Sequence, residues 1–138
     1  MLSRRYPMYV IPLSTLLEMN EFRPHQELLA DGTLVEANVS MAPKTIFISH
    51  QWLGFDHPDP KSEQLRALQQ VLRRLLEGRT SVTSGKYYGA ASLGIHKVCA
   101  AEWKDRLRGA YVWFDFMCAC PRAADCDHAA RLALCPQH

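Results

Sequence analysis

Hydrophobic positions along the chain gather in two short, nearly uninterrupted runs. Residues 45–50 and 110–117 are rich in β-branched and aromatic side chains, and Asp115 is the one Asp, Glu, Lys or Arg among them. Runs of this kind are typical of strands that are buried on both faces of a sheet. We therefore expect two central strands.

The clearest helix signal in the sequence lies between these two runs. Asp59 is a suitable N-cap, Pro60 suits the first helical position, and Gly78 is placed to end the helix. Apolar residues recur at three- and four-residue spacing, and polar residues fill the opposite side. The predicted buried stripe consists of Leu65, Leu68, Val71, Leu72, Leu75 and Leu76.

A strand, a helix and a second strand make a βαβ unit, which requires the two strands to be parallel. Their carboxyl ends then lie at one edge of the sheet, where open α/β sheets bind ligands. The candidate ligand-binding residues of this strand-end crevice are Ser49, His50, Gln51, Trp52 and Asp115.

Weaker patterns predict further short elements. We expect an edge strand at residues 8–13, a helix at 15–19, a strand at 33–36 and a helical turn at 100–107. Asp31 and Gly32 end another helical turn just before the second of these strands, because glycine accepts the left-handed conformation of such stops.

The composition is that of one globular domain: 138 residues, 48% hydrophobic and 22% charged, with a formal net charge of +2. This balance argues against a dedicated nucleic-acid binder. No run approaches the roughly 18 apolar residues that a membrane span needs. The five cysteines form no even disulfide framework, so we expect reduced thiols and a cytoplasmic location.

Several of these segments together resemble a TIR-like (Toll/interleukin-1 receptor-like) group found in uncharacterised proteins of unicellular eukaryotes, and distantly the heterokaryon-incompatibility domains. The similar stretches are FISHQW at 47–52, HPDP at 57–60, VWFD at 112–115 and PHQELL at 24–29. The resemblance covers roughly residues 24–120. It implies a flavodoxin-like fold, with a parallel sheet and flanking helices, in proteins that assemble signalling complexes or cleave NAD.

The sequence departs from this group after Asp115. The group has a Cys-Ile-Pro-Gln-like turn there, whereas this chain has CACPR at 118–122, and residues 122–138 contain no glutamate to match the one used for NAD cleavage. Glu102 precedes the second strand and does not match it either. We therefore expect no catalytic residue in this chain, and NAD is implied as a cofactor by the resemblance alone.

These observations favour a TIR-like protein-interaction or signalling module, with a protein partner or self-association, and with neither nucleic acid nor membrane as a partner. The alternative is a nucleotide-binding or NAD-cleaving enzyme of the same group. We divide the chain into a lead-in segment with short helices (1–44), a βαβ core (45–117) and an irregular or loosely helical tail (118–138). The few strong strands predict a partial sheet, truncated at the C-terminus, with an unpaired edge.

The candidate crevice residues also have simpler interpretations. Asp115 and His50 either bind the polar part of a ligand or satisfy nearby backbone groups. Trp52 either stacks on a ring or covers the core. Ser49 and His50 do not suit a hydrolase, because neighbours on a strand point to opposite faces.

Two groups of residues contain side chains of the types that bind metals. Asp56, His57 and Asp59 lie close together, but capping explains Asp59. The zinc alternative in the tail has spacings unlike those of zinc knuckles, so we expect no metal. Its ligands would be Cys118, Cys120, Cys126 and His128.

Overall fold

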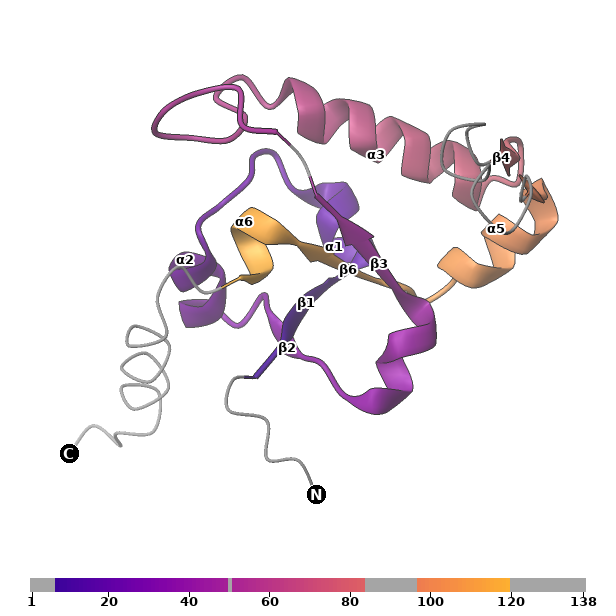
Figure 1. The fold of residues 1–138 in the computed structure, drawn as a ribbon, viewed down its shortest axis with the longest axis horizontal. Helices are drawn as coiled ribbons and strands as arrows, with labels where there is room; N and C mark the ends of the chain where they lie inside the picture. Colours follow the sequence, from indigo (N-terminus) through magenta and orange to yellow (C-terminus); the bar gives the residue numbers. More distant parts are fainter. Residues whose placement is uncertain (1–6, 50, 84–96, 120–138) are drawn as a thin grey trace, which may run out of the picture.

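The computed structural model describes residues 7–49, 51–83 and 97–119, and its main sheet is built around strand β6 (Tyr111–Phe114). The strand order is β2-β1-β6-β3. On one side β6 pairs in parallel with β3 (Thr45–Ile48), and on the other it pairs antiparallel with β1 (Tyr9–Pro12). Strand β2 (Val35–Glu36) lies antiparallel to β1, so the sheet contains both parallel and antiparallel pairs. Together with its flanking helices it makes a mixed α/β fold (Figure 1).

The predicted parallel sheet is confirmed only for the pair β3–β6, whose register runs from Thr45 opposite Tyr111 to Ile48 opposite Phe114. For the sheet as a whole the prediction is wrong, because β1 and β2 introduce antiparallel pairing. The hydrophobic pattern of a short strand is the same whichever way its neighbour runs. Only the long helix between β3 and β6 indicated the relative direction of two strands, because such a crossover joins parallel strands.

The predicted positions of two strands within the sheet are also wrong. Residues 8–13 were expected at an edge, but β1 lies between β2 and β6, and Val10 and Ile11 are fully buried. Residues 45–50 were expected at the centre, but β3 is the outermost strand of the described sheet. The side chain of Phe47 is 64% exposed, so one face of β3 is not covered by the described part of the chain.

Helix α3 (Glu63–Leu76) confirms the predicted amphipathic helix and contacts both α1 (Leu13–Glu18) and α5 (Ala100–Leu107), as Figure 1 shows. Its buried residues are Leu65, Leu72 and Leu75, with Leu68 and Leu76 partly buried against the same core. Val71 was predicted to be part of this stripe, but its side chain points outward and is 51% exposed. Gly78 has a φ of 73° and follows the end of the helix, as predicted.

The remaining elements are short. Helix α2 (His25–Ala30) and helix α6 (Asp115–Cys118) contact each other at one end of the sheet (Figure 1). Strand β6 therefore ends at Phe114, three residues earlier than the apolar run predicted. The sequence did not predict the 3₁₀ helix η1 (Val39–Lys44) or the antiparallel pair of β4 (Val82–Thr83) and β5 (Lys97–Val98).

The lead-in segment is part of the same core as the βαβ unit. Phe22 is almost fully buried and stacks on Phe114 of β6, with ring centroids 4.5 Å apart. Val112 and Phe114 alternate with half-buried Tyr111 and Trp113, so one face of β6 carries the packed side chains. The core of the described chain thus forms between segments that are distant in the sequence.

The loop between β3 and α3 is held by backbone hydrogen bonds to two buried or half-buried side chains. The Asp59 carboxylate is 1% exposed and accepts from the backbone N–H groups of Glu63 (3.0 Å) and Leu65 (2.9 Å). The predicted N-cap position of Asp59 is wrong, because the helix begins at Glu63 and Ser62 is its N-cap residue. The Asp59 carboxylate nevertheless caps the first turn of the helix through these two bonds. The residue before the helix, Ser62, has a left-handed backbone with a φ of 54°.

His57 joins this loop to the lead-in segment. Its Nδ1 accepts from the backbone N–H of Asp59 (3.0 Å), so its Nε2 carries the hydrogen and donates to the carbonyl of Phe22 (2.7 Å). Both ring nitrogens of His57 and both carboxylate oxygens of Asp59 are thus hydrogen-bonded to backbone groups. These bonds give both side chains backbone partners.

Replacing Asp59 by alanine should lower the free energy of unfolding by about 1–3 kcal/mol, because two buried N–H groups lose their acceptor. Urea unfolding followed by circular dichroism measures the change. Asp59→Asn keeps one acceptor oxygen and should lose less. Asp56→Ala, which alters an exposed aspartate of the same loop, serves as the control. Equal stability of Asp59→Ala and Asp56→Ala would contradict the capping role.

Candidate functional site

A cavity of about 360 Å³ lies where the parallel strands β3 and β6 end and α6 begins. It is formed by three segments that are far apart in the sequence: the start of α2, the loop after β3, and α6. The lining residues are Pro24, His25, Gln26, Trp52, Asp115, Phe116 and Ala119. Its position agrees with the strand-end crevice that the βαβ pattern predicted.

Two of the five predicted crevice residues line this cavity, namely Trp52 and Asp115. Ser49 and Gln51 are exposed and do not line it. The Gln51 carbonyl accepts from the side-chain amide of Gln64 at 3.4 Å. His50 lies outside the described residues, so its predicted role stays a prediction.

Sequence reasoning missed His25, whose side chain is 2% exposed and lines the cavity. Its Nδ1 lies 3.0 Å from the carbonyl oxygen of Met117, which only accepts, so Nδ1 carries the hydrogen and donates. The other nitrogen, Nε2, is buried and has no hydrogen-bond partner in the described chain. His25 belongs to the PHQELL stretch that supports the TIR-like resemblance, and this resemblance was the one sequence signal that could have pointed to His25.

Burial lowers the pKa of His25 below its ordinary value of 6.5, and the hydrogen bond to the Met117 carbonyl opposes this only in part. Desolvation penalises the charged imidazolium, so the ring is held neutral near pH 7. Its Nε2 is therefore a buried hydrogen-bond acceptor.

Among the lining residues that the structure describes, Asp115 provides the only carboxylate. One of its oxygens accepts from the backbone N–H of Phe116 at 2.9 Å, which supports the simpler interpretation that this aspartate satisfies a backbone group. The bond also fixes the carboxylate at the first turn of α6. Asp115 therefore combines a local structural role with a place in the cavity wall.

The aromatic wall of the cavity is made by Trp52 and Phe116, whose ring planes are nearly perpendicular (88°) with centroids 5.5 Å apart. Phe116 also meets the ring of His57 edge-on at 5.7 Å. Trp52 is 47% exposed, so it does not cover the core as one of its two interpretations required. It presents aromatic surface to the cavity and to solvent.

Cys118 is the one residue of the zinc alternative within the described ranges. Its buried thiol donates to the carbonyl of Val112, with sulfur and oxygen 3.7 Å apart, and burial raises its pKa to about 11. Cys120, Cys126 and His128 lie outside those ranges. Among the described residues, no three His, Cys, Asp or Glu side chains are grouped as metal ligands.

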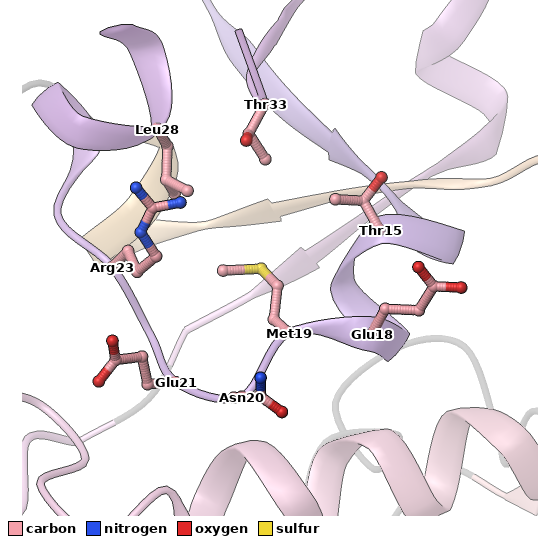
Figure 2. Close-up of a pocket in the computed structure, with 8 residues that line it drawn as sticks. All are labelled: Thr15, Glu18, Met19, Asn20, Glu21, Arg23, Leu28 and Thr33. Atoms are coloured by element: carbon pink, nitrogen blue, oxygen red, sulfur yellow. The ribbon is translucent and has the colours of Figure 1, made fainter. Parts of the chain in front are cut away.

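A second pocket lies between α1 and α2 (Figure 2). Its one cationic lining residue, Arg23, is held by Asp31 at 2.6 Å and by Glu27 at 3.5 Å. The pKa of Asp31 is lowered, first by hydrogen bonding from Thr33 and then by Arg23. These contacts stabilise the end of α2. The lining residues are Thr15, Glu18, Met19, Asn20, Glu21, Arg23, Leu28 and Thr33.

The fold and the cavity define a mixed α/β domain whose strand-end cavity lies beside the one parallel strand pair of the described sheet. Comparison of the chain with protein-family models, curated proteins and solved structures found no significant match. No helix in the described ranges has the length and apolar character needed to cross a bilayer.

The buried neutral His25 predicts a loss of stability in mild acid. The unfolded chain protonates this residue near pH 6.5, whereas the folded chain does so only at lower pH. Stability should therefore fall as the pH drops below about 6.5, and the loss is complete below the folded-state pKa. Urea unfolding at about pH 7.5 and about pH 5 measures it.

His25→Asn isolates this contribution, because asparagine offers an N–H to the Met117 carbonyl but does not titrate. The variant should lose less stability than the wild type between the two pH values. A wild type and variant with the same pH dependence would contradict the burial of a neutral imidazole at this position.

Proposed function

We propose that this chain is a TIR-like protein-interaction or signalling module that associates through the outer edge of β3. The observation that carries the proposal is the place of β3 at the end of the strand order. In the part of the chain that the structure describes, no strand pairs with its outer edge. Its outward N–H and C=O groups therefore suit pairing with a strand from a second copy or from another protein.

The residues of β3 carry neither a charge nor a proline, two features that often protect an edge strand. The sequence of the strand is Thr-Ile-Phe-Ile. The nearest basic side chain, Lys44, precedes the strand and donates to the carbonyl of Arg108 at 3.1 Å. These properties favour strand addition at this edge over repulsion from it.

An exposed aromatic residue lies on the same strand and supports association there. Phe47 is 64% exposed, and its ring lies 5.8 Å from that of Trp113, its register partner on β6. Aromatic residues are enriched at protein interfaces, where their burial supplies much of the binding energy. Phe47 would anchor a partner whose strand extends the sheet beside it.

The alternative of a nucleotide-binding or NAD-cleaving enzyme has less support from the described cavity. Trp52 and Asp115 both line it, but among the lining residues within the described ranges there is no lysine or arginine to pair with a phosphate. Release of nicotinamide from NAD by the purified protein, abolished by Asp115→Asn, would favour that alternative over interaction alone.

Replacing Phe47 by lysine should abolish self-association, because a charge on the edge strand opposes strand pairing and the aromatic anchor is lost. Light scattering over a range of concentrations should give a rising mass for the wild type and a constant monomer mass for Phe47→Lys. Because Phe47 is exposed, thermal unfolding should change little, by less than about 1 kcal/mol.

Val71→Lys is the matched control, since it places the same charge on the exposed side of α3. It should associate as the wild type does. A wild type that stays monomeric at every concentration, with no strand partner from another protein, would refute the proposal. So would a Phe47→Lys variant that associates normally.

A further inference from the structure

The two outer strands of the described sheet differ in length and charge. Strand β2 consists of two residues, Val35 and Glu36, and the glutamate is exposed. Strand β3 has four residues, and none of them carries a charge. Short or charged edge strands resist the addition of another strand, whereas a longer uncharged edge accepts one. A strand that extends this sheet is therefore expected beside β3 and not beside β2.

This difference distinguishes two ways in which copies of the chain can join their sheets. Pairing of β3 in one copy with β2 in the next is head-to-tail and repeats into an open filament. Pairing of β3 with β3 uses the same edge in both copies and closes at a dimer. The short, charged β2 disfavours the filament. Strand β3 meets its own copy without repulsion between like charges, because its four residues are uncharged.

The alternation of side chains along β3 restricts how two copies of it can align. Ile46 and Ile48 pack partly buried against the core, whereas Phe47 lies on the other face beside Trp113 and is 64% exposed. A two-fold axis perpendicular to the sheet makes the two strands antiparallel and keeps matching side chains on the same face. Phe47 then lies directly opposite Phe47 of the second copy, and Ile46 opposite Ile48. Aromatic cross-strand pairs stabilise antiparallel strands.

The exposed hydrophobic residues around β3 are an independent indication of the same partner. Five of the seven large hydrophobic residues that are exposed in the described ranges lie between residues 39 and 55, namely Val39, Phe47, Trp52, Leu53 and Phe55. Val39 lies in η1, just before the strand, and Leu53 and Phe55 lie in the loop after it. In an antiparallel pair, the segment before one strand lies beside the segment after the other. Each Val39 would therefore approach the loop 53–55 of the second copy.

We propose that the partner at the β3 edge is a second copy of this chain, paired antiparallel about a two-fold axis with Phe47 opposite Phe47. This inference rests on the proposed association through β3, to which it adds the partner, the direction of pairing and the register. The described sheets then join in the order β2-β1-β6-β3-β3-β6-β1-β2. Both ends of this joined sheet are the short, charged β2, which opposes further growth.

Light scattering and NMR of the purified chain test the closed dimer and its register. The mass of the wild type should rise with concentration to that of a dimer and then stay constant. In an equimolar mixture of isotope-labelled and unlabelled protein, isotope-filtered nuclear Overhauser effects report only contacts between copies. Such contacts should join the ring protons of Phe47 to those of Phe47 in the other copy, and Val39 to the loop 53–55.

A matched pair of variants tests the contact outside the strand. Val39→Ser removes an exposed apolar side chain beside β3 and should raise the dissociation constant of the dimer by about five-fold or more. Val71→Ser makes the same substitution at an exposed position of α3 and should leave the dissociation constant unchanged. Equal effects of the two substitutions would contradict the antiparallel arrangement.

The outcomes separate this inference from the proposed function. Growth of the wild type beyond a dimer, blocked by Phe47→Lys, would overturn the closed pairing and leave association through β3 standing. So would a wild type that stays monomeric and pairs only with a strand of another protein. A dimer without contacts between the two Phe47 rings would overturn the register. Association that Phe47→Lys does not change would refute the proposed function itself.

Discussion

The burial of β6 between β1 and β3 is the constraint on which the other features of the fold depend. Val112 and Phe114 are essentially inaccessible to solvent, and Phe114 stacks on Phe22 from the lead-in segment. Removing this apolar surface from water stabilises the sheet and packs the lead-in segment and the βαβ unit around one core. Because β6 stops at Phe114, Asp115 opens the short helix α6 at the strand end, and the cavity forms there.

The loop after β3 connects this core to the cavity wall. His57 bonds to the carbonyl of Phe22 and receives a bond from Asp59, which in turn caps α3. Gly54 permits the tight path of the loop, since an added Cβ would lie 2.8 Å from the carbonyl oxygen of His57. This network places Trp52 beside Phe116. The cavity is therefore positioned by backbone hydrogen bonds as well as by apolar packing.

The sequence predicted the elements that have a long hydrophobic pattern or that two independent signals indicate. Helix α3 has a repeating apolar stripe and a capping aspartate, and it forces the parallel pairing of β3 with β6. The places of β1 and β3 in the sheet were predicted wrongly, because composition shows that a strand is apolar but not whether another strand pairs with its outer edge. His25 gave no chemical signal of its own. Its role arises from a contact with Met117, 92 residues away, and from burial that only the fold creates.

The unpaired edge of β3 is the central claim for function, and amide hydrogen exchange tests it most directly. In a parallel pair, alternate amides of β3 point away from β6 and have no partner within the described sheet. At low protein concentration these amides should exchange rapidly while those of β6 are strongly protected. They should become protected as the concentration rises or a strand partner is added. Strong protection of all β3 amides in the dilute monomer would show that the edge is already covered and would contradict the account.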